Sequence, residues 1–333
     1  MTKEFHLKLY YQMLRIRMVE EAIAEAYPKQ KMRTPVHLSI GQEAVAAASS
    51  MVLEKQDYAV STHRAHAHYL AKGGSLNAMV AELHGKVTGC CRGRGGSMHL
   101  VDKTVGFWGS TAIVGNTIPI GVGLGLSVQL DQSKRISCVF IGDGAIEEGV
   151  FYESLNFAVV RQLPVLFICE NNLYSVYTPI HKRQPAGRHI HALAKAIGAE
   201  TMVANGYEVM DAFDGIKNAA DFVRQGKGPC FIELSTYRWR EHCGPNFDNE
   251  LGYRSVEEYE QWAKQDSILS QEKVLREQFF VETAIFAEMR EHIDCEINAA
   301  FDFAVASEYP PAGEGLTGEY SQSVVEEGLL CEA

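Results

Sequence analysis

The 333-residue sequence has no long hydrophobic run and no cysteine pair spaced as Cys-x-x-Cys. No stretch approaches the roughly 18 apolar residues that a membrane-spanning helix needs, so we expect no membrane partner. The first residues show neither an apolar signal-peptide core nor the basic, serine-rich character of a transit peptide. Because Cys138 and Cys169 also lie in apolar runs, the sequence favours a reducing, cytoplasmic location.

Positive charge is in deficit. The chain has 31 Lys and Arg against 42 Asp and Glu, which gives a formal net charge of −11. Neither nucleic acid nor an anionic membrane surface is therefore expected as a partner. Any phosphate would have to be bound locally, by loops, helix ends or a metal ion. The hydrophobic content of 46% is enough for a substantial core in a chain of this length.

Short apolar runs alternate with helical segments in the middle of the chain. Residues 135–141, 164–170 and 228–239 read as buried strands, and residues 147–162 predict a helix between the first two. Continuous apolar strands separated by helices indicate a parallel sheet that is covered on both faces. We therefore predict an α/β fold with a doubly wound parallel sheet.

The remaining segments are predicted to be mainly helical. Apolar residues recur at helical spacing early in the chain, residues 35–100 read as alternating loops and helices, and a polar helical region runs to about residue 305. We expect an N-terminal helical segment (1–34), an α/β domain with C-terminal helices (35–310) and a loosely ordered tail (311–333).

Two motifs carry most of the functional information. Asp143, within Gly-Asp-Gly, directly follows the predicted strand 135–141. Asn172, which lies 29 positions after Asp143, belongs to the asparagine pair that directly follows strand 164–170. Ligands of open parallel sheets bind beyond the carboxyl ends of the strands, so these two side chains should meet at one edge. Because Mg²⁺ prefers oxygen ligands and often completes its shell with phosphates, the spacing predicts a magnesium–phosphate site.

The glycines beside Asp143 support this interpretation. Gly142 and Gly144 would let the backbone approach a diphosphate, and the following helix N-terminus would add partial positive charge. The alternative is that Gly-Asp-Gly is only a tight turn and that the asparagine pair is a surface loop. A single Gly-Asp-Gly would favour that alternative, whereas the paired motif with a strand before each half favours the metal site.

With these motifs the sequence resembles thiamine-diphosphate enzymes. In particular, it is similar to the α subunit of the decarboxylating first component of 2-oxo acid dehydrogenase complexes, of the pyruvate and acetoin dehydrogenase type. The resemblance runs from about residue 7 to residue 320. It is carried by VHLSIGQEA (36–44), STHRAHAHYLAKG (61–73), GRGGSMH (93–99), IVGNTIPIG (113–121), GDGAIEEGVFYESLNFA (142–158), ICENNLYS (168–175) and TYRWREHC (236–243).

The resemblance implies thiamine diphosphate and Mg²⁺ as cofactors. Asp143, Asn172 and the backbone of Tyr174 would hold the metal ion, and Gly144 and Ala145 would contact the diphosphate.

Further residues are assigned by the same resemblance. Arg64 would pair with a phosphate, and His63 stands where many members have tyrosine. His37 would lie near the cofactor, and Ala112 and Val114 would offer backbone groups to the aminopyrimidine.

A loop near the end of the α/β region completes the implied site. His242 would be an active-site histidine on a mobile loop, and Arg238 would be another phosphate contact. Cys243 and Gly252 occupy positions where mitochondrial members carry phosphorylated serines, so kinase control is not expected. The acidic character of residues 242–255 departs from the common family pattern.

The resemblance also implies that the chain is half of a site. The carboxylate that activates the pyrimidine ring belongs in this family to a separate β subunit, so we expect an α₂β₂ heterotetramer with the cofactor at the interface. The implied reaction is decarboxylation of pyruvate or another 2-oxo acid, or cleavage of acetoin, followed by acyl transfer to a lipoyl group on an acyltransferase partner. Ketol transfer or carboligation with a β subunit, and a non-catalytic assembly role, stay open as alternatives.

Three other clusters have competing interpretations. The histidines at 63, 66 and 68 suggest zinc, but Arg64 beside them suits a phosphate, and histidines are more often hydrogen-bonded core residues. The glycines at 121, 123 and 125 suggest a dinucleotide turn, but no clear strand precedes them and their spacing fits a close-packed helix. Cys90 and Cys91 could be metal ligands, although neighbouring side chains rarely point together.

Overall fold

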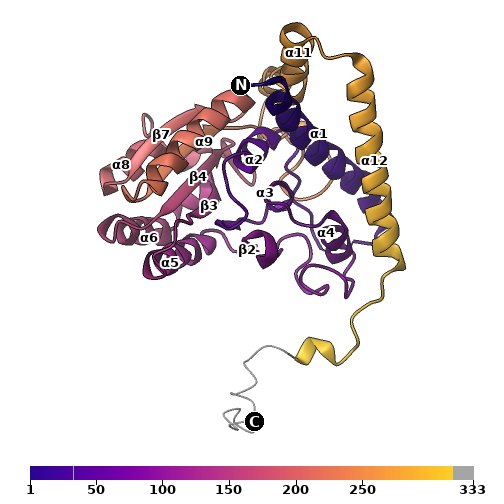
Figure 1. The fold of residues 1–333 in the computed structure, drawn as a ribbon, viewed down its shortest axis with the longest axis horizontal. Coiled ribbons are helices and arrows are strands. Elements are labelled where there is room, and N and C mark those ends of the chain that lie inside the picture. The colour runs from indigo at the N-terminus through magenta and orange to yellow at the C-terminus, as the bar shows by residue number, and fades with distance from the viewer. Residues whose placement is uncertain (33, 318–333) are drawn as a thin grey trace.

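A six-stranded parallel sheet forms the centre of the molecule (Figure 1). The structure is a computed structural model that describes residues 1–32 and 34–317. The strand order is β2-β1-β3-β4-β8-β7, and a two-stranded antiparallel ribbon, β5-β6, follows β4. The strands are β1 (Tyr58–Ser61), β2 (Phe107–Ser110), β3 (Ser137–Gly142), β4 (Val165–Asn171), β5 (Tyr174–Ser175), β6 (Thr178–Pro179), β7 (Glu200–Asn205) and β8 (Cys230–Ser235).

Helices cover both faces of the sheet, which confirms the predicted doubly wound architecture. One face carries α5 (Thr117–Leu130), α6 (Gly149–Val160) and α8 (Ile190–Ile197). The other carries α9 (Val209–Arg224), with α2 (Glu43–Ser50) packed beside it. Figure 1 shows α5 and α6 on the side of the sheet away from α2 and α1.

The alternation of side chains along the central strands explains why both faces are covered. Val139 of β3 and Phe167 of β4 belong to the apolar cluster formed with α5, α6 and α8. Their neighbours Phe140 and Ile168 belong to the larger cluster on the opposite face. Successive strand residues point to opposite faces, so strands that are apolar at every position need a helical layer on each side.

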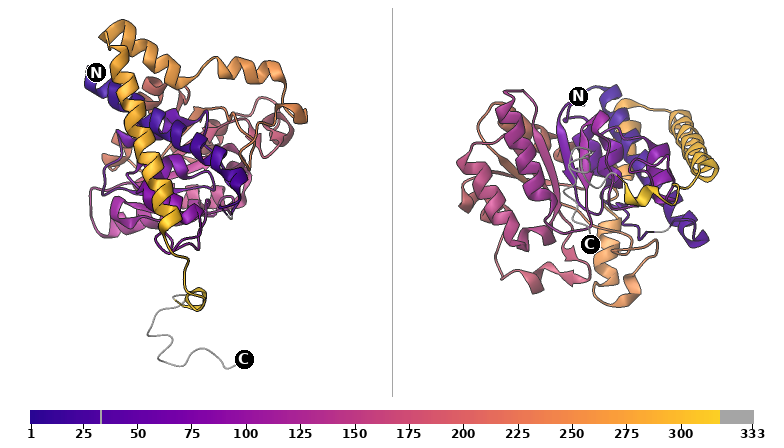
Figure 2. Two further views of the ribbon diagram at one scale, coloured as in Figure 1. Left: turned by 90° about the vertical axis from the view of Figure 1, so that its right-hand side faces the viewer. Right: turned by 90° about the horizontal axis from the view of Figure 1, so that it is seen from below.

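The N- and C-terminal helices pack together outside the second face. α1 (Lys3–Ala26) lies beside α12 (Thr283–Ala306), and α11 (Ser267–Phe279) packs on the start of α1 (Figures 1 and 2). The Arg17 guanidinium joins these layers, because it pairs with Glu43 of α2 and with Asp266 before α11. The remaining α-helices of the described residues are α3 (His66–Ala71), α4 (Leu76–Leu83), α7 (Ile180–Arg183) and α10 (Val256–Ala263).

Some sequence predictions need correction. The interpretation of residues 35–100 as loops and helices is wrong at β1, which is only four residues long and too short to show a pattern. β8 ends at Ser235 rather than near residue 239. The C-terminal helical region is confirmed, and it consists of α10, α11 and α12, with α11 ending at Phe280, which has a φ of 50°.

Other predictions are not tested by the structure. The boundaries at residues 34 and 310 stay a prediction, and most of the predicted tail lies outside the described residues. Within the described part of the chain, no helix is both long and apolar enough to cross a bilayer.

The glycine repeat of residues 121–125 lies inside α5 and not in a turn. A Cβ atom at Gly121 would overlap the side chain of Val139, and one at Gly125 would overlap that of Val165. Gly123 faces open space on the other side of the helix. The structure thus confirms the close-packed helix and not the dinucleotide turn, because the glycines let α5 approach β3 and β4 closely.

Alanine at two positions of this repeat should act in opposite directions. Gly121→Ala should destabilise the fold by about 1–3 kcal/mol, because the new methyl group has no room beside Val139. Gly123→Ala on the same helix should stabilise it by up to about 1 kcal/mol through helix propensity alone. Urea unfolding of both variants checks this, and equal effects would contradict the packing argument.

Candidate functional site

The order of the strands places a crevice between β1 and β3. From β1 the chain passes outward to β2, and from β3 it passes to the opposite side, to β4. The carboxyl ends of β1 and β3 therefore flank the topological switch point, which is where open α/β sheets bind ligands. A cavity of about 170 Å³ opens there, and residues that follow β1, β2, β3, β4 and β8 line it.

Eleven of the twelve predicted site residues line this cavity. They are His37, His63, Arg64, Ala112, Val114, Asp143, Gly144, Ala145, Asn172, Tyr174 and His242. The structure therefore brings these residues together from segments that are far apart in the sequence, while their individual roles stay predictions. Arg238 is not among the lining residues.

Asp143 and Asn172 meet at one edge of the sheet, as their spacing predicts. Gly142 of β3 lies opposite Glu170 of β4, so the residues that follow both strands are neighbours. The backbone N–H of Asn172 donates to the Asp143 carboxylate, and the side-chain amide of Asn172 donates to Gln42 Oε1 at 3.2 Å. Burial raises the pKa of Asp143, and its pairing with the Arg183 guanidinium opposes that rise.

Three imidazoles face one another across the cavity. The ring centroids of His37, His63 and His242 are separated by 4.6, 5.1 and 5.2 Å. Burial, reinforced by the charge of Arg64, lowers the pKa of His37 to about 2 and the pKa values of His63 and His242 to about 3. The Nδ1 atom of His37 is buried and has no hydrogen-bond partner in the described chain. The three rings are therefore neutral near pH 7, and His37 has a polar atom available for a ligand.

Arg64 makes this part of the cavity positive. Its guanidinium donates to the carbonyl oxygens of Leu38 at 2.6 Å and His242 at 3.0 Å, and not to a carboxylate. Burial, followed by the charge of Arg238, lowers the pKa of Arg64 to about 9. A buried cation held only by carbonyl dipoles favours an anion nearby. The cluster of three histidines therefore suits a phosphate or carboxylate better than a second cation.

The other two histidines of the predicted zinc alternative do not join this cluster. His66 bonds to Glu20 at 2.9 Å and to Ser97 at 2.8 Å. His68 bonds to Ser61 at 2.8 Å and lies 3.2 Å from Glu170. Both are buried, so the expectation of hydrogen-bonded core histidines is confirmed for them.

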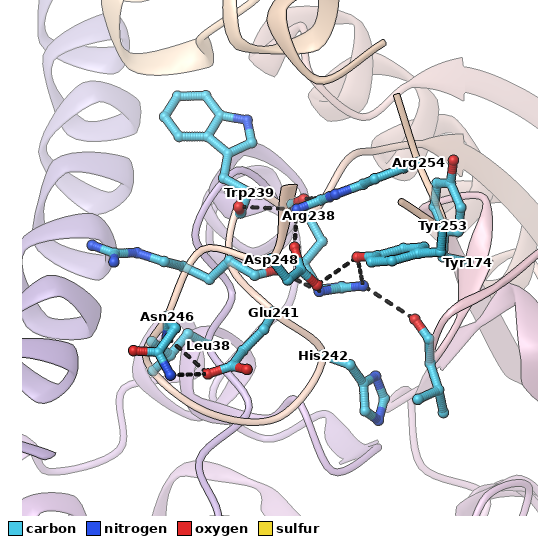
Figure 3. A network of polar contacts seen from close by, with 12 residues as sticks. Leu38, Tyr174, Arg238, Trp239, Glu241, His242, Asn246, Asp248, Tyr253 and Arg254 are labelled. Carbon is cyan, nitrogen blue, oxygen red and sulfur yellow. Dashed lines mark hydrogen bonds and ion pairs between the residues drawn. The ribbon is translucent and has the colours of Figure 1, made fainter. Parts of the chain in front are cut away.

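Arg238 belongs to a buried polar network that lies above His242 in the view of Figure 3. The carboxylate of Asp248 accepts hydrogen bonds from Arg238, Arg254 and the Tyr253 hydroxyl, and Asp248 is 3% exposed. The acidic segment after His242 is thus partly an internal anchor for two arginines. The predicted contact between Arg238 and a phosphate stays a prediction.

Sequence reasoning missed several residues at the site. Gln42 lines the cavity and accepts a hydrogen bond from the Asn172 amide. It could have been predicted, because it belongs to the segment 36–44 that carries part of the family resemblance. Arg183 pairs with Asp143, but it lies at the end of the short helix α7 in a segment without a motif, so no sequence signal marked it. The other lining residues are Thr62, Met98, Gly115, Gly142, Glu170, Ser175 and Val176.

A buried glutamate fixes the glycine-rich loop that leads to the cavity wall. The Glu82 carboxylate of α4 accepts hydrogen bonds from the backbone N–H groups of Cys91, Gly93, Gly95 and Gly96, at 2.6–3.1 Å. This loop leads to Met98 in the cavity wall.

The same bend of the chain brings Cys90 and Cys91 together. Their sulfur atoms and a Glu82 oxygen lie within 4.8 Å of one another. The expectation that these neighbouring side chains diverge is therefore wrong, because the turn around the carboxylate gathers them. The Glu82 oxygens are already used by the backbone.

The fold and the cavity define an α/β protein with a pocket at the switch point of a parallel sheet, where open sheets bind ligands. The sequence model of the family described as "Dehydrogenase E1 component" matches residues 11–312. The chain belongs to this family, which confirms the resemblance found in its motifs.

Relatives match over nearly the whole chain. The pyruvate dehydrogenase E1 component subunit alpha of Rickettsia bellii is 35% identical over 319 residues, which cover 96% of this chain and 97% of the relative. The chloroplastic subunit alpha-3 of Arabidopsis thaliana is 36% identical, covering 96% of this chain and 75% of the relative. The subunit alpha of Porphyra purpurea is 35% identical, covering 94% and 92%.

Replacing one cavity histidine should weaken the acid sensitivity of the fold. An unfolded histidine takes up a proton below pH 6.5, whereas His63 in the folded chain does so only near pH 3. Stability is therefore lost as the pH falls below 6.5, and each such imidazole accounts for up to about 2 kcal/mol at pH 5. His63→Phe should lose less stability than the wild type between pH 7.5 and 5.0 in urea unfolding.

The matched control is the exposed His189. His189→Gln should leave the difference in stability between the two pH values unchanged. An unchanged difference in His63→Phe would contradict the assignment of a neutral, buried His63.

Proposed function

We propose that this chain is the α subunit of a thiamine-diphosphate- and Mg²⁺-dependent 2-oxo acid dehydrogenase of the pyruvate type. The observation that carries the proposal is the meeting of Asp143 and Asn172 beside a positively charged, histidine-lined cavity at the switch point. The relatives named as pyruvate dehydrogenase subunits support the same assignment.

The residues present fit a metal ion and a diphosphate. Asp143 offers a carboxylate that is 1% exposed, and Asn172 and the backbone of Tyr174 lie beside it at the same edge. Hard oxygen ligands of this kind suit Mg²⁺. A Cβ atom at Gly144 would lie 2.7 Å from Ser175 Oγ, so the closeness of the backbone there depends on glycine. The ligand roles of these residues, with Ala145, are part of the proposal.

The cation that faces the diphosphate would be Arg64. Its guanidinium already lies against the cavity, fixed by two carbonyl groups, so it needs no rearrangement to receive a phosphate oxygen. In the proposal Ala112 and Val114 present their backbone groups to the aminopyrimidine, and Arg238 steadies the His242 loop from behind or reaches a phosphate. When bound, thiamine diphosphate would supply the electron sink for loss of CO₂ from a 2-oxo acid.

The neutral histidines would act next to that chemistry. His37, His63 and His242 can each donate one hydrogen bond and accept another while uncharged. Such groups can hold the carboxylate or carbonyl oxygen of a substrate and hold or move a proton at a ring nitrogen. His242 is proposed as the catalytic residue, because it lies on the loop after β8 at the cavity wall.

Two features support the proposal that a second chain completes the site. The cavity volume of about 170 Å³ is below the roughly 300 Å³ at the lower end for pockets that bury a small-molecule ligand. Helix α5 has no charged residue, yet Ile120 on it is 48% exposed, as is Val114 at the cavity, and Ile113 is 65% exposed. An apolar surface beside a partial pocket fits a β subunit, and an α₂β₂ heterotetramer belongs to the proposal.

The substrate and the later partner are less closely defined by the residues. Pyruvate is proposed because the relatives carry that name, and acetoin or a branched-chain 2-oxo acid are the nearest alternatives. A lipoyl-bearing acyltransferase and a cytoplasmic location complete the proposal. Ketol transfer would use the same cofactor site without a lipoyl acceptor, and an assembly subunit would not need the cofactor at all.

Activity should require both subunits. The chain with its β subunit, Mg²⁺ and thiamine diphosphate should reductively acylate lipoamide with pyruvate, while the chain alone should be nearly inactive. Release of CO₂ and formation of S-acetyldihydrolipoamide are measured, with acetoin and branched-chain 2-oxo acids as competing substrates. Turnover without lipoamide in a ketol-transfer assay would contradict the proposal, as would full turnover by the chain alone.

Asp143→Asn should abolish most of the metal-dependent cofactor binding. The change keeps the size of the side chain but removes the charge that would hold Mg²⁺. Charge-assisted contacts contribute about 1.5–3 kcal/mol, so the affinity for thiamine diphosphate should fall at least about tenfold. Calorimetry with the assembled protein measures this, and Asp131→Asn at the exposed end of α5 is the control. Equal affinity in Asp143→Asn and wild type would rule out the metal site.

A further inference from the structure

A buried arginine occupies the carboxylate that the proposed function assigns to the metal ion. The guanidinium of Arg183, on the short helix α7, pairs with Asp143 and also donates to Glu147 Oε1 at 2.6 Å. Its Nε atom donates to the carbonyl oxygen of Thr178 at 3.1 Å. The side chains of Arg183 and Asp143 are 9% and 2% exposed, so this ion pair is largely shielded from water.

The contact between Arg183 and Asp143 opposes cofactor binding in two ways. One carboxylate oxygen of Asp143 is engaged by a guanidinium, so a second cation meets both a competitor for that oxygen and a repelling charge. Arg183 also gives no direct help to a ligand here, because it is not among the residues that line the cavity.

Arg183 nevertheless lies close to the expected diphosphate position. Its Nη1 atom is 3.9 Å from the point that a Cβ atom at Gly144 would occupy, and Ser175 of the cavity wall is nearer still to that point. Guanidinium groups bind phosphate oxygens bidentately, and they bind them more readily than ammonium groups in buried sites. A small rotation of the side chain would therefore exchange a carboxylate for a phosphate.

The segment that carries Arg183 is held in a way that suits both positions of the guanidinium, against Asp143 and against a phosphate. The side chain of Gln184 donates to Glu147 at 2.9 Å, and Glu147 ends the short 3-10 helix that begins at Asp143. The preceding ribbon β5-β6 contains Val176 with a φ of 56°, a left-handed conformation that is unfavourable for a β-branched residue. The segment is thus anchored at Glu147 and strained at Val176.

We propose that Arg183 is a positioning residue that holds Asp143 in the ligand-free chain, gives way to Mg²⁺ and then binds the diphosphate. This inference rests on the proposed cofactor. It makes the metal ion and the diphosphate cooperative, because the metal ion frees the guanidinium that the diphosphate uses.

Replacement of Arg183 by glutamine should change the two affinities in opposite directions. Binding of a divalent ion alone should become roughly tenfold tighter, because the competitor for Asp143 is gone. Binding of thiamine diphosphate at saturating Mg²⁺ should become about three- to tenfold weaker, because one phosphate contact is lost. If the ion pair between Arg183 and Asp143 were purely structural, its loss would weaken the binding of both ligands, since Asp143 would lose its support.

The measurement uses the full-length chain purified with its β subunit. Mn²⁺ serves as the probe of the metal site, with the free ion measured by electron paramagnetic resonance, and calorimetry reports thiamine diphosphate. Lys182→Gln is the matched control, because the exposed neighbouring residue removes the same charge without touching Asp143. It should leave both affinities unchanged.

Thermal unfolding gives a third, independent signal. Without metal, Arg183→Gln should be less stable than the wild type, because two carboxylates lose their cation. Added Mn²⁺ should raise its melting temperature more than that of the wild type.

The outcomes separate the role inferred for Arg183 from the proposed cofactor function. Mn²⁺ binding in Arg183→Gln that is unchanged or weaker overturns the inference, and so does tighter Mn²⁺ binding with unchanged or tighter binding of thiamine diphosphate. If the wild type binds no thiamine diphosphate, the proposed function fails, whereas the Mn²⁺ experiment still decides whether Arg183 competes for Asp143.

Discussion

The parallel register between β3 and β4 places Gly142 opposite Glu170, and the rest of the site depends on this pairing. A slip by one residue would turn the apolar side chains of β3 to the wrong faces and would move Asp143 away from Asn172. The two apolar layers prevent such a slip, because Val139 and Phe140 each fit a different cluster. The packing that stabilises the sheet therefore also fixes the position of the candidate metal ligands.

Around that fixed edge, the charges are buried and only partly compensated. Arg64 is held by carbonyl groups, Asp143 by Arg183, and three imidazoles stay neutral because they are buried beside a guanidinium. Such an arrangement is costly in an empty cavity and becomes favourable when an anion and a cation enter together. Arg64 and the three imidazoles are already held in place around the cavity, whereas Asp143 is still paired with Arg183.

The sequence could predict the sheet, the covering helices and most of the candidate site, because strand patterns and motif spacing are local properties. It could not show that His63 turns toward His37 and His242 while His66 and His68 turn into the core, since this depends on which face of a loop meets the sheet. It also missed β1, because four residues show no periodicity. Arg183 could not be predicted for another reason. It lies 40 positions after Asp143, and an ion pair between residues so far apart in the sequence leaves no local pattern.

The uncharged helix α5 has a consequence for the way in which the cell must produce this chain. One side of the helix is packed on the sheet through Gly121 and Gly125, and the other side leaves Ile120 and Leu130 exposed. A newly made copy without a binding partner would present that side to chaperones, proteases and other copies of itself. If the proposed β subunit covers that side, synthesis of the two chains together would shorten the time for which the side is exposed.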